Sequence, residues 1–142
     1  MNHKPMLNAY PDSLGGNLGD IVTLLKTEAM QDVFSSFYIL PSLYHSDLDR
    51  GFSVIDYDLN ELLADREDLD QLKNMGINLK LDFILNHASA QSPQFQDLVE
   101  KGEASAYRDF FIDWNRFWEG HGTMTEEGYI QPEESCLKQM FF

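Results

Sequence analysis

Cysteine and basic residues are scarce in this chain of 142 residues. The one cysteine, Cys136, cannot form a disulfide within the chain, and a single cysteine is typical of a protein in a reducing compartment. Only 10 lysines and arginines stand against 24 acidic residues, which gives a formal net charge of −14. This balance argues against nucleic acid and anionic membrane surfaces as partners.

Long apolar runs and phosphate-binding glycine loops are also missing. No stretch approaches the roughly 20 apolar residues of a transmembrane helix, and the first residues form no secretory signal pattern. We therefore expect a cytoplasmic protein. No glycine-rich loop of the P-loop or Rossmann kind is present. His3, His45 and His121 lack metal-ligand spacing, so the sequence predicts neither a metal nor another cofactor.

Strand and helix patterns alternate in the first part of the chain. Residues 6–10, 33–40 and 77–85 read as strands. Between them, apolar residues recur at helical spacing after Asn17 and after Asp65, which can cap helices. Strands that alternate with helices predict an α/β fold with a parallel sheet and right-handed crossovers.

The third predicted strand carries the most informative residues. Asp82 lies in the middle of its apolar run, and a buried carboxylate requires a partner. Asn86 and His87 follow where the strand should end, and ligand-binding residues gather at the carboxyl ends of parallel strands.

The remaining segments are less regular. We expect a polar loop over residues 42–60 and a short helix from Pro93 to about Gly102. Aromatic residues at helical spacing from Tyr107 to Trp118 predict a second helix, whose stripe packs in a core. Residues 120–142 have no clear period.

Three parallel strands leave both edges of a sheet open. A (β/α)₈ barrel needs about 250 residues, so the chain reads as the first third of one. We expect residues 1–90 to form that part of the barrel, and residues 91–142 to form a separate, helical segment.

Several motifs support this interpretation. Residues 82–87, Asp-Phe-Ile-Leu-Asn-His, resemble the first conserved region of α-amylase-type glycoside hydrolases. Residues 10–15 (Tyr-Pro-Asp-Ser-Leu-Gly) and 49–57 (Asp-Arg-Gly-Phe-Ser-Val-Ile-Asp-Tyr) are similar to strand ends and loops of the sucrose phosphorylase branch of that family.

The resemblance implies a (β/α)₈ barrel with a B domain inserted after the third strand, so that residues 91–142 would form a helical segment and the start of that insertion. It also implies a retaining enzyme that transfers an α-glucosyl group from sucrose or a related α-glucoside to inorganic phosphate. The nucleophile and the acid/base of this branch follow later strands. We therefore expect no catalytic residue within these 142 residues, and no activity from them alone.

The same resemblance assigns substrate contacts. Asp49 would accept hydrogen bonds from sugar hydroxyls, Phe52 would form an apolar wall, and His87 would hydrogen-bond a hydroxyl. Asp82, which would orient an arginine, and Asn86 would support these residues without touching the substrate.

Other interpretations stay open at this point. An α-glucosidase or amylase-type hydrolase of the same fold fits residues 82–87 equally well, and a truncated product without catalysis fits the missing carboxylates. The loop from Ser42 to Asp49 differs from that of sucrose-specific members. Phosphorylases of sucrose, sucrose 6-phosphate, glucosylglycerol and glucosylglycerate all remain candidates.

Overall fold

The computed structural model describes residues 4–41 and 43–140. His3 and Ser42, which entered the expectations above, lie outside the described residues, as do residues 141–142 at the end of the tail. The chain forms two compact units, Met1–Gln96 and Asp97–Phe142, and each is described by itself.

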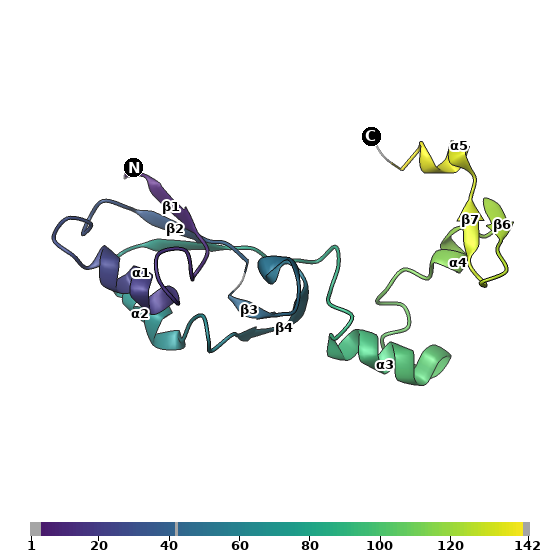
Figure 1. The fold of residues 1–142 in the computed structure, drawn as a ribbon, viewed down its shortest axis with the longest axis horizontal. Coiled ribbons are helices and arrows are strands. Elements are labelled where there is room, and N and C mark those ends of the chain that lie inside the picture. Colours follow the sequence, from purple (N-terminus) through teal and green to yellow (C-terminus); the bar gives the residue numbers. More distant parts are fainter. Residues whose placement is uncertain (1–3, 42, 141–142) are drawn as a thin grey trace. The chain divides into compact units, whose positions relative to one another are not determined.

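The first unit is built on a three-stranded parallel sheet, which confirms the predicted alternation of strands and helices (Figure 1). In spatial order its strands are β1 (Met6–Ala9), β2 (Ser36–Ile39) and β5 (Asn78–Leu81). Because β2 pairs in register with both neighbours, the carboxyl ends of all three strands meet at one edge.

The third strand is shorter than the sequence predicted. β5 ends at Leu81 rather than at residue 85, because its pairing partner β2 ends at Ile39 and no strand continues beside it. The apolar side chains of Phe83 and Leu85 are consequently exposed. The prediction that Asp82 lies inside a buried strand was wrong: it follows the strand and is half-buried.

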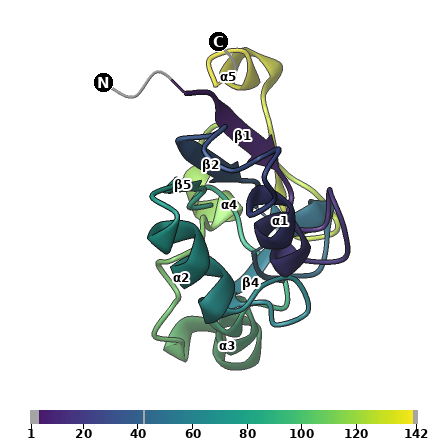
Figure 2. The same ribbon diagram turned by 90° about the vertical axis from the view of Figure 1, so that its left-hand side faces the viewer.

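Two helices cover one face of the sheet. They are α1 (Leu18–Leu25) and α2 (Arg66–Asn74), which lie side by side (Figures 1 and 2). The predicted caps are confirmed: the Asn17 side chain caps α1, and Asp65 forms a reciprocal capping box with Asp68 on α2. Gly76, with φ +74°, ends α2 in a left-handed turn.

The core therefore lies on one side of the sheet only. Phe37 and Ile39 of β2 are buried against the helices, together with Leu18, Ile21 and Leu72. Alternate residues along each strand point to the opposite face. That face carries Asn8, Tyr38 and Lys80 side by side, together with the exposed Met6.

A hairpin replaces part of the predicted polar loop. β3 (Tyr44–Ser46) and β4 (Val54–Leu59) pair antiparallel. The alternation from Val54 to Leu59 is the strand signal that the sequence reading missed. Between the two strands lies the 3₁₀ turn η1 (Asp49–Gly51).

Ser89 ties this hairpin to the segment that follows β5. Its backbone N–H donates to the Val54 carbonyl (2.8 Å), and its hydroxyl donates to the Asp47 carboxylate (2.7 Å). Ser89 and Val54 are buried, so the backbone bond between them is shielded from water, whereas the Asp47 carboxylate is exposed. Hydrogen bonds from the side chains of Ser53 and Ser89 lower the pKa of Asp47.

The remaining elements are short. They are α3 (Pro93–Lys101), η2 (Gly102–Ala104), α4 (Trp114–Phe117), β6 (Gly122–Met124), β7 (Ile130–Pro132) and α5 (Glu134–Leu137). The predicted helix from Pro93 is confirmed. β6 and β7 form a hairpin in the tail, where no pattern had predicted one.

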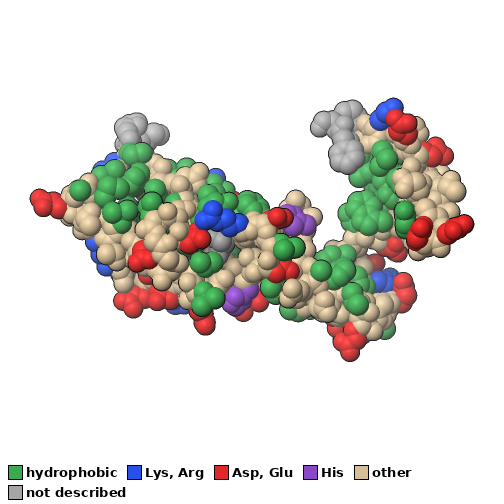
Figure 3. All heavy atoms as spheres, viewed as in Figure 1, with side chains coloured by type: hydrophobic (Ala, Val, Ile, Leu, Met, Phe, Trp, Pro, Cys, Tyr) green, Lys and Arg blue, Asp and Glu red, His purple; other side chains and the backbone are tan. Residues whose placement is uncertain are grey.

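The predicted aromatic helix from Tyr107 to Trp118 was wrong. Only α4 forms, because the Asp113 side chain accepts the N–H groups of Asn115 and Arg116 and starts a new helix there. The stripe is not core either: among its large side chains Trp118 is buried, whereas Trp114 is 52% exposed. Apolar side chains accordingly reach the surface of the second unit (Figure 3).

The surface of both units carries scattered acidic side chains rather than one acidic patch in the view of Figure 3. Among the described residues, no helix has the length and apolar character needed to span a membrane.

The capping box gives the first prediction. Replacing Asp65 with Ala removes the acceptor for the Asp68 N–H and should lower the free energy of unfolding by about 1 kcal/mol. Chemical denaturation of the 142-residue chain measures this. Asp70→Ala on the exposed side of the same helix is the matched control, and an equal loss in both variants would contradict the capping role.

The Asp47 network gives a pH prediction. Because the folded state lowers the pKa of Asp47, its stabilising effect is present above the unfolded carboxyl pKa and is lost as the pH falls through the folded value. Asp47→Asn should therefore destabilise the chain at pH 7, and the difference from the unmodified chain should shrink in acid. Thermal melts across this pH range test the sign. A difference that grows on acidification would be incompatible with the network.

Candidate functional site

The carboxyl edge of the sheet brings three loops together. The turn after β1 carries Tyr10 and Asp12, the connection after β2 leads through the β3–β4 hairpin, and Asp82 follows β5. This is the edge at which α/β folds bind ligands. All five predicted site residues lie in the second and third of these loops: Asp49 and Phe52 in the second, and Asp82, Asn86 and His87 in the third.

The Asp49–Phe52 segment has an unusual backbone. Asp49 and Arg50 both have φ of +53°, and Gly51 follows with φ of +103°. A non-glycine residue in this region costs about 1–3 kcal/mol and persists only where its surroundings enforce it. Asp49 is exposed, Phe52 is half-buried, and Gly51 is buried. The Asp49 side chain therefore faces solvent. The strained backbone that carries it requires stabilising contacts from neighbouring residues.

Arg50 reaches from this segment to the turn after β1. Its Nη2 atom donates to Oδ1 of Asp12 at 2.8 Å, and its guanidinium carbon lies 4.2 Å from the centre of the Tyr10 ring. The sequence predictions gave no role to Arg50, although it lies within the stretch 49–57 that resembles the phosphorylase branch. The basic residue directly after Asp49 in the sequence was the signal that could have pointed to an ion pair at this position.

Asp82 has a partner that the sequence reading did not foresee. The Tyr38 hydroxyl lies 2.7 Å from Oδ1 and 2.6 Å from Oδ2 of Asp82, and it donates to that carboxylate. The hydrogen bond to Asp82 raises the pKa of Tyr38. Strand alternation could have found this pair, because Tyr38 is in register with Lys80, and Lys80 and Asp82 lie on one side of the chain.

His87 and Asn86 lie beyond the strand in an exposed segment. Neither side chain is buried, and both precede the buried Ser89. The bonds from Ser89 to Asp47 and Val54 connect this segment to both flanks of Asp49–Phe52. The structure thus brings the regions of Asp49, Phe52 and His87 together at one edge, and it leaves the polar side chains of Asp49 and His87 open to solvent.

Aromatic side chains support the same segment. The Tyr57 ring packs against Phe83 (4.8 Å between centres) and Tyr44 (5.1 Å), and its hydroxyl donates to the Ile84 carbonyl. This cluster joins the hairpin to the chain that leads to His87. The sequence reading missed it because its members come from three separate segments.

No cluster of three or more histidine, cysteine or acidic side chains suited to a metal ion occurs in the part of the chain that the structure describes.

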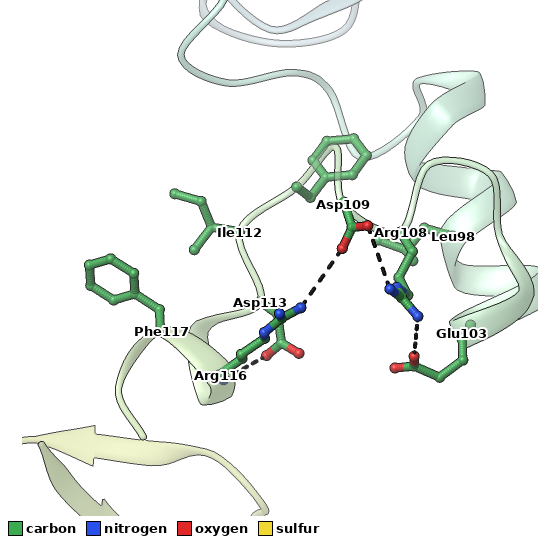
Figure 4. A pocket seen from close by; sticks show the side chains of 10 residues that line it. Leu98, Glu103, Arg108, Asp109, Ile112, Asp113, Arg116 and Phe117 are labelled. Atoms are coloured by element: carbon green, nitrogen blue, oxygen red, sulfur yellow. Dashed lines mark hydrogen bonds and ion pairs between the residues drawn. The ribbon is translucent and has the colours of Figure 1, made fainter. Parts of the chain in front are cut away.

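A hollow of about 850 Å³ lies in the second unit, between the end of α3 and α4 (Figure 4). Both of its arginines already lie beside carboxylates. Arg108 pairs with Glu103 (3.1 Å) and Asp109 (3.5 Å), and Arg116 lies 3.9 Å from Asp109. The hollow contains none of the predicted site residues, and its paired charges offer no obvious anion site, so we do not assign it a ligand.

Comparison with known proteins agrees with the motifs. The sequence model "Alpha amylase, catalytic domain" matches residues 10–141. The chain is 54% identical over 139 residues to a sucrose 6(F)-phosphate phosphorylase of Ilumatobacter coccineus, covering 98% of this chain and 27% of the relative. It is 40% identical to a sucrose phosphorylase of Streptococcus mutans, covering 82% of this chain and 24% of the relative.

A solved structure agrees as well. The crystal structure of sucrose 6F-phosphate phosphorylase from Thermoanaerobacter thermosaccharolyticum superposes with a TM-score of 0.77 at 36% identity, over 84% of this chain and 24% of that one. The chain thus spans about a quarter of the length of the relatives it matches. It has the fold of the amino-terminal part of a (β/α)₈ barrel, and it belongs to the α-amylase catalytic-domain family, with sucrose-type phosphorylases among its similar relatives.

Proposed function

We propose that this chain supplies part of the glucose-binding subsite of a retaining glucoside phosphorylase. The complete enzyme transfers an α-glucosyl group from sucrose or a related α-glucoside to inorganic phosphate. It needs no metal or organic cofactor for this role, and the single cysteine supports a cytoplasmic location.

One observation carries the proposal. The two segments that hold Asp49, Phe52 and His87 are bound together by Ser89 at the carboxyl edge of a barrel sheet. The identity of 54% to a phosphorylase supports the same activity. Two exposed polar side chains and a half-buried aromatic ring, carried by segments that Ser89 joins, suit a sugar, which presents hydroxyl groups along its rim and C–H groups on its faces.

Each predicted site residue has a separate role in the proposed subsite. Asp49, which accepts but does not donate when ionised, binds sugar hydroxyls, and His87 hydrogen-bonds another hydroxyl. Phe52 forms the apolar wall. Asp82 is fixed by Tyr38, and Asn86 steadies the backbone next to His87. None of these groups is the nucleophile or the acid/base of the double displacement, which we assign to strands outside this chain.

Residues 91–142 lead, in this proposal, into the domain inserted after the third barrel strand. That role suits a segment with short elements and exposed aromatic side chains. The glucosyl donor is an α-glucoside; sucrose 6-phosphate is favoured among the candidates by the relative that is 54% identical.

A hydrolase is the second candidate. The chain is 30% identical to an intracellular maltogenic amylase of Bacillus subtilis over 70% of its length. The same subsite would bind glucose in such an enzyme, and water rather than phosphate would accept the glucosyl group.

A chimera tests whether this chain forms a working glucose-binding subsite. The 142 residues replace the corresponding part of the Ilumatobacter coccineus phosphorylase, and release of the leaving group from sucrose 6-phosphate and from sucrose is measured with and without phosphate. We expect turnover that depends on phosphate and yields α-glucose 1-phosphate. Because the rest of the chimera is a phosphorylase, a folded chimera, verified by circular dichroism and a cooperative melt, that shows no turnover would mean that this chain does not form the proposed subsite.

Variants of the subsite give a second test in the same chimera. Asp49→Asn keeps the size of the side chain and tolerates positive φ, but it weakens hydrogen bonds to sugar hydroxyls. Hydrogen bonds to charged groups contribute about 1.5–3 kcal/mol, so kcat/KM should fall on the order of 10- to 100-fold. His87→Ala should also lower kcat/KM.

Asp70→Asn on α2 is the matched control and should leave kcat/KM unchanged. Retention of full activity by Asp49→Asn would remove Asp49 from the subsite.

A further inference from the structure

The backbone of the Asp49–Phe52 segment is held by more than its own hydrogen bonds. Within the turn, the Gly51 N–H donates to the Leu48 carbonyl at 3.4 Å, and the Phe52 N–H donates to the Asp49 carbonyl at 3.3 Å. Both bonds are long. Two more backbone bonds bracket the turn, from the Ser53 N–H to the Leu48 carbonyl (3.4 Å) and from the Asp47 N–H to the Ser53 carbonyl (3.2 Å). Two consecutive non-glycine residues inside the turn have positive φ, and a side-chain contact with a neighbouring loop adds to what stabilises this conformation.

Arg50 supplies that contact through two interactions with one partner segment. Its guanidinium donates to Asp12 at 2.8 Å and lies over the Tyr10 ring at 4.2 Å. A planar guanidinium can stack and donate at the same time, which an ammonium group cannot do. Arg50 is therefore fixed in direction as well as in distance.

The partner segment is itself well anchored. The Ser13 N–H donates to the Tyr10 carbonyl (3.1 Å), and the Tyr10 N–H donates to the Ser13 hydroxyl (3.0 Å). Pro11 between them is fully buried. This turn directly follows β1, so Arg50 ties the second loop of the edge to the end of a core strand.

The neighbouring carboxylate is left free for a ligand. Asp49 is exposed, and its side chain takes part in no hydrogen bond or ion pair within the described residues. The Arg50 guanidinium is thus paired with the Asp12 carboxylate, and the Asp49 carboxylate stays available to a ligand.

We propose that Arg50, clamped by Asp12 and Tyr10, is a positioning residue that holds Asp49 and Phe52 in the conformation that binds the glucosyl group. Arg50 does not touch the sugar. This inference rests on the proposed function of Asp49, and it adds a specific link between the first and second loops of the site.

The test measures donor binding and turnover separately in the chimeric enzyme. Arg50→Asn is the informative variant, because Asn adopts positive φ readily and leaves the backbone preference intact while the clamp is lost. We expect KM for the α-glucoside to rise roughly tenfold while kcat changes less than about twofold, since a loss of uniform binding acts on KM.

Asp12→Ala and the double variant Asp12→Ala/Arg50→Asn complete a cycle. If both residues act through one clamp, the double variant should raise KM no more than either single variant does. Arg66→Asn, on the exposed first turn of α2, is the matched control and should leave both constants unchanged. An unchanged KM in Arg50→Asn, or additive effects in the double variant, would overturn the proposal.

A second readout keeps the clamp separate from the proposed function. In the 142-residue chain, amide hydrogen exchange at Gly51 and Phe52 should become on the order of tenfold faster in Arg50→Asn, while exchange at Phe37 in β2 stays the same. If the chimera fails to use phosphate but exchange responds as expected, the proposed function fails and the clamp stands. Unchanged exchange at Gly51 and Phe52 overturns the clamp even in an active chimera.

Discussion

The parallel pairing of β2 with both β1 and β5 is the constraint on which the site depends. It puts the ends of three strands at one edge, and it therefore delivers the turn with Asp12, the hairpin with Asp49 and the segment with His87 to the same region. The core beneath the sheet is modest and one-sided, with Phe37 and Ile39 packed against two capped helices. Helix capping contributes to the stability of the sheet because the two capped helices, α1 and α2, cover its packed face.

The strands bring the three loops close together, and polar contacts between the loops then fix their relative positions. Ser89 joins the His87 segment to the hairpin, Arg50 joins the hairpin to the turn after β1, and Tyr38 holds Asp82. In each case the contact is made by residues other than the proposed substrate-binding side chains themselves, and Ser89 and Arg50 neighbour those side chains in the sequence. This division explains why a site can be recognisable in a chain that spans about a quarter of its relatives.

Local chemistry made part of this structure predictable. Asn17, Asp65 and Gly76 act within a few residues of their own position, so the ends of α1 and α2 followed from the sequence. The parallel sheet followed from the order of the patterns. Local chemistry did not predict the β3–β4 hairpin or the Tyr38–Asp82 bond. Strand alternation was their only signal, because Tyr38 and Asp82 are 44 positions apart and the register of the hairpin is irregular. The helix over residues 107–118 failed because one capping residue, Asp113, outweighed a periodic aromatic pattern.

The central claim is that Asp49 and His87 belong to one glucose-binding subsite. A crystal structure of the chimeric enzyme with α-D-glucose bound tests it most directly. The account predicts that the Asp49 carboxylate and the His87 ring each lie within about 3.2 Å of a sugar hydroxyl, with the Arg50–Asp12 pair intact behind them. Glucose bound in the barrel without contact to either side chain would contradict it.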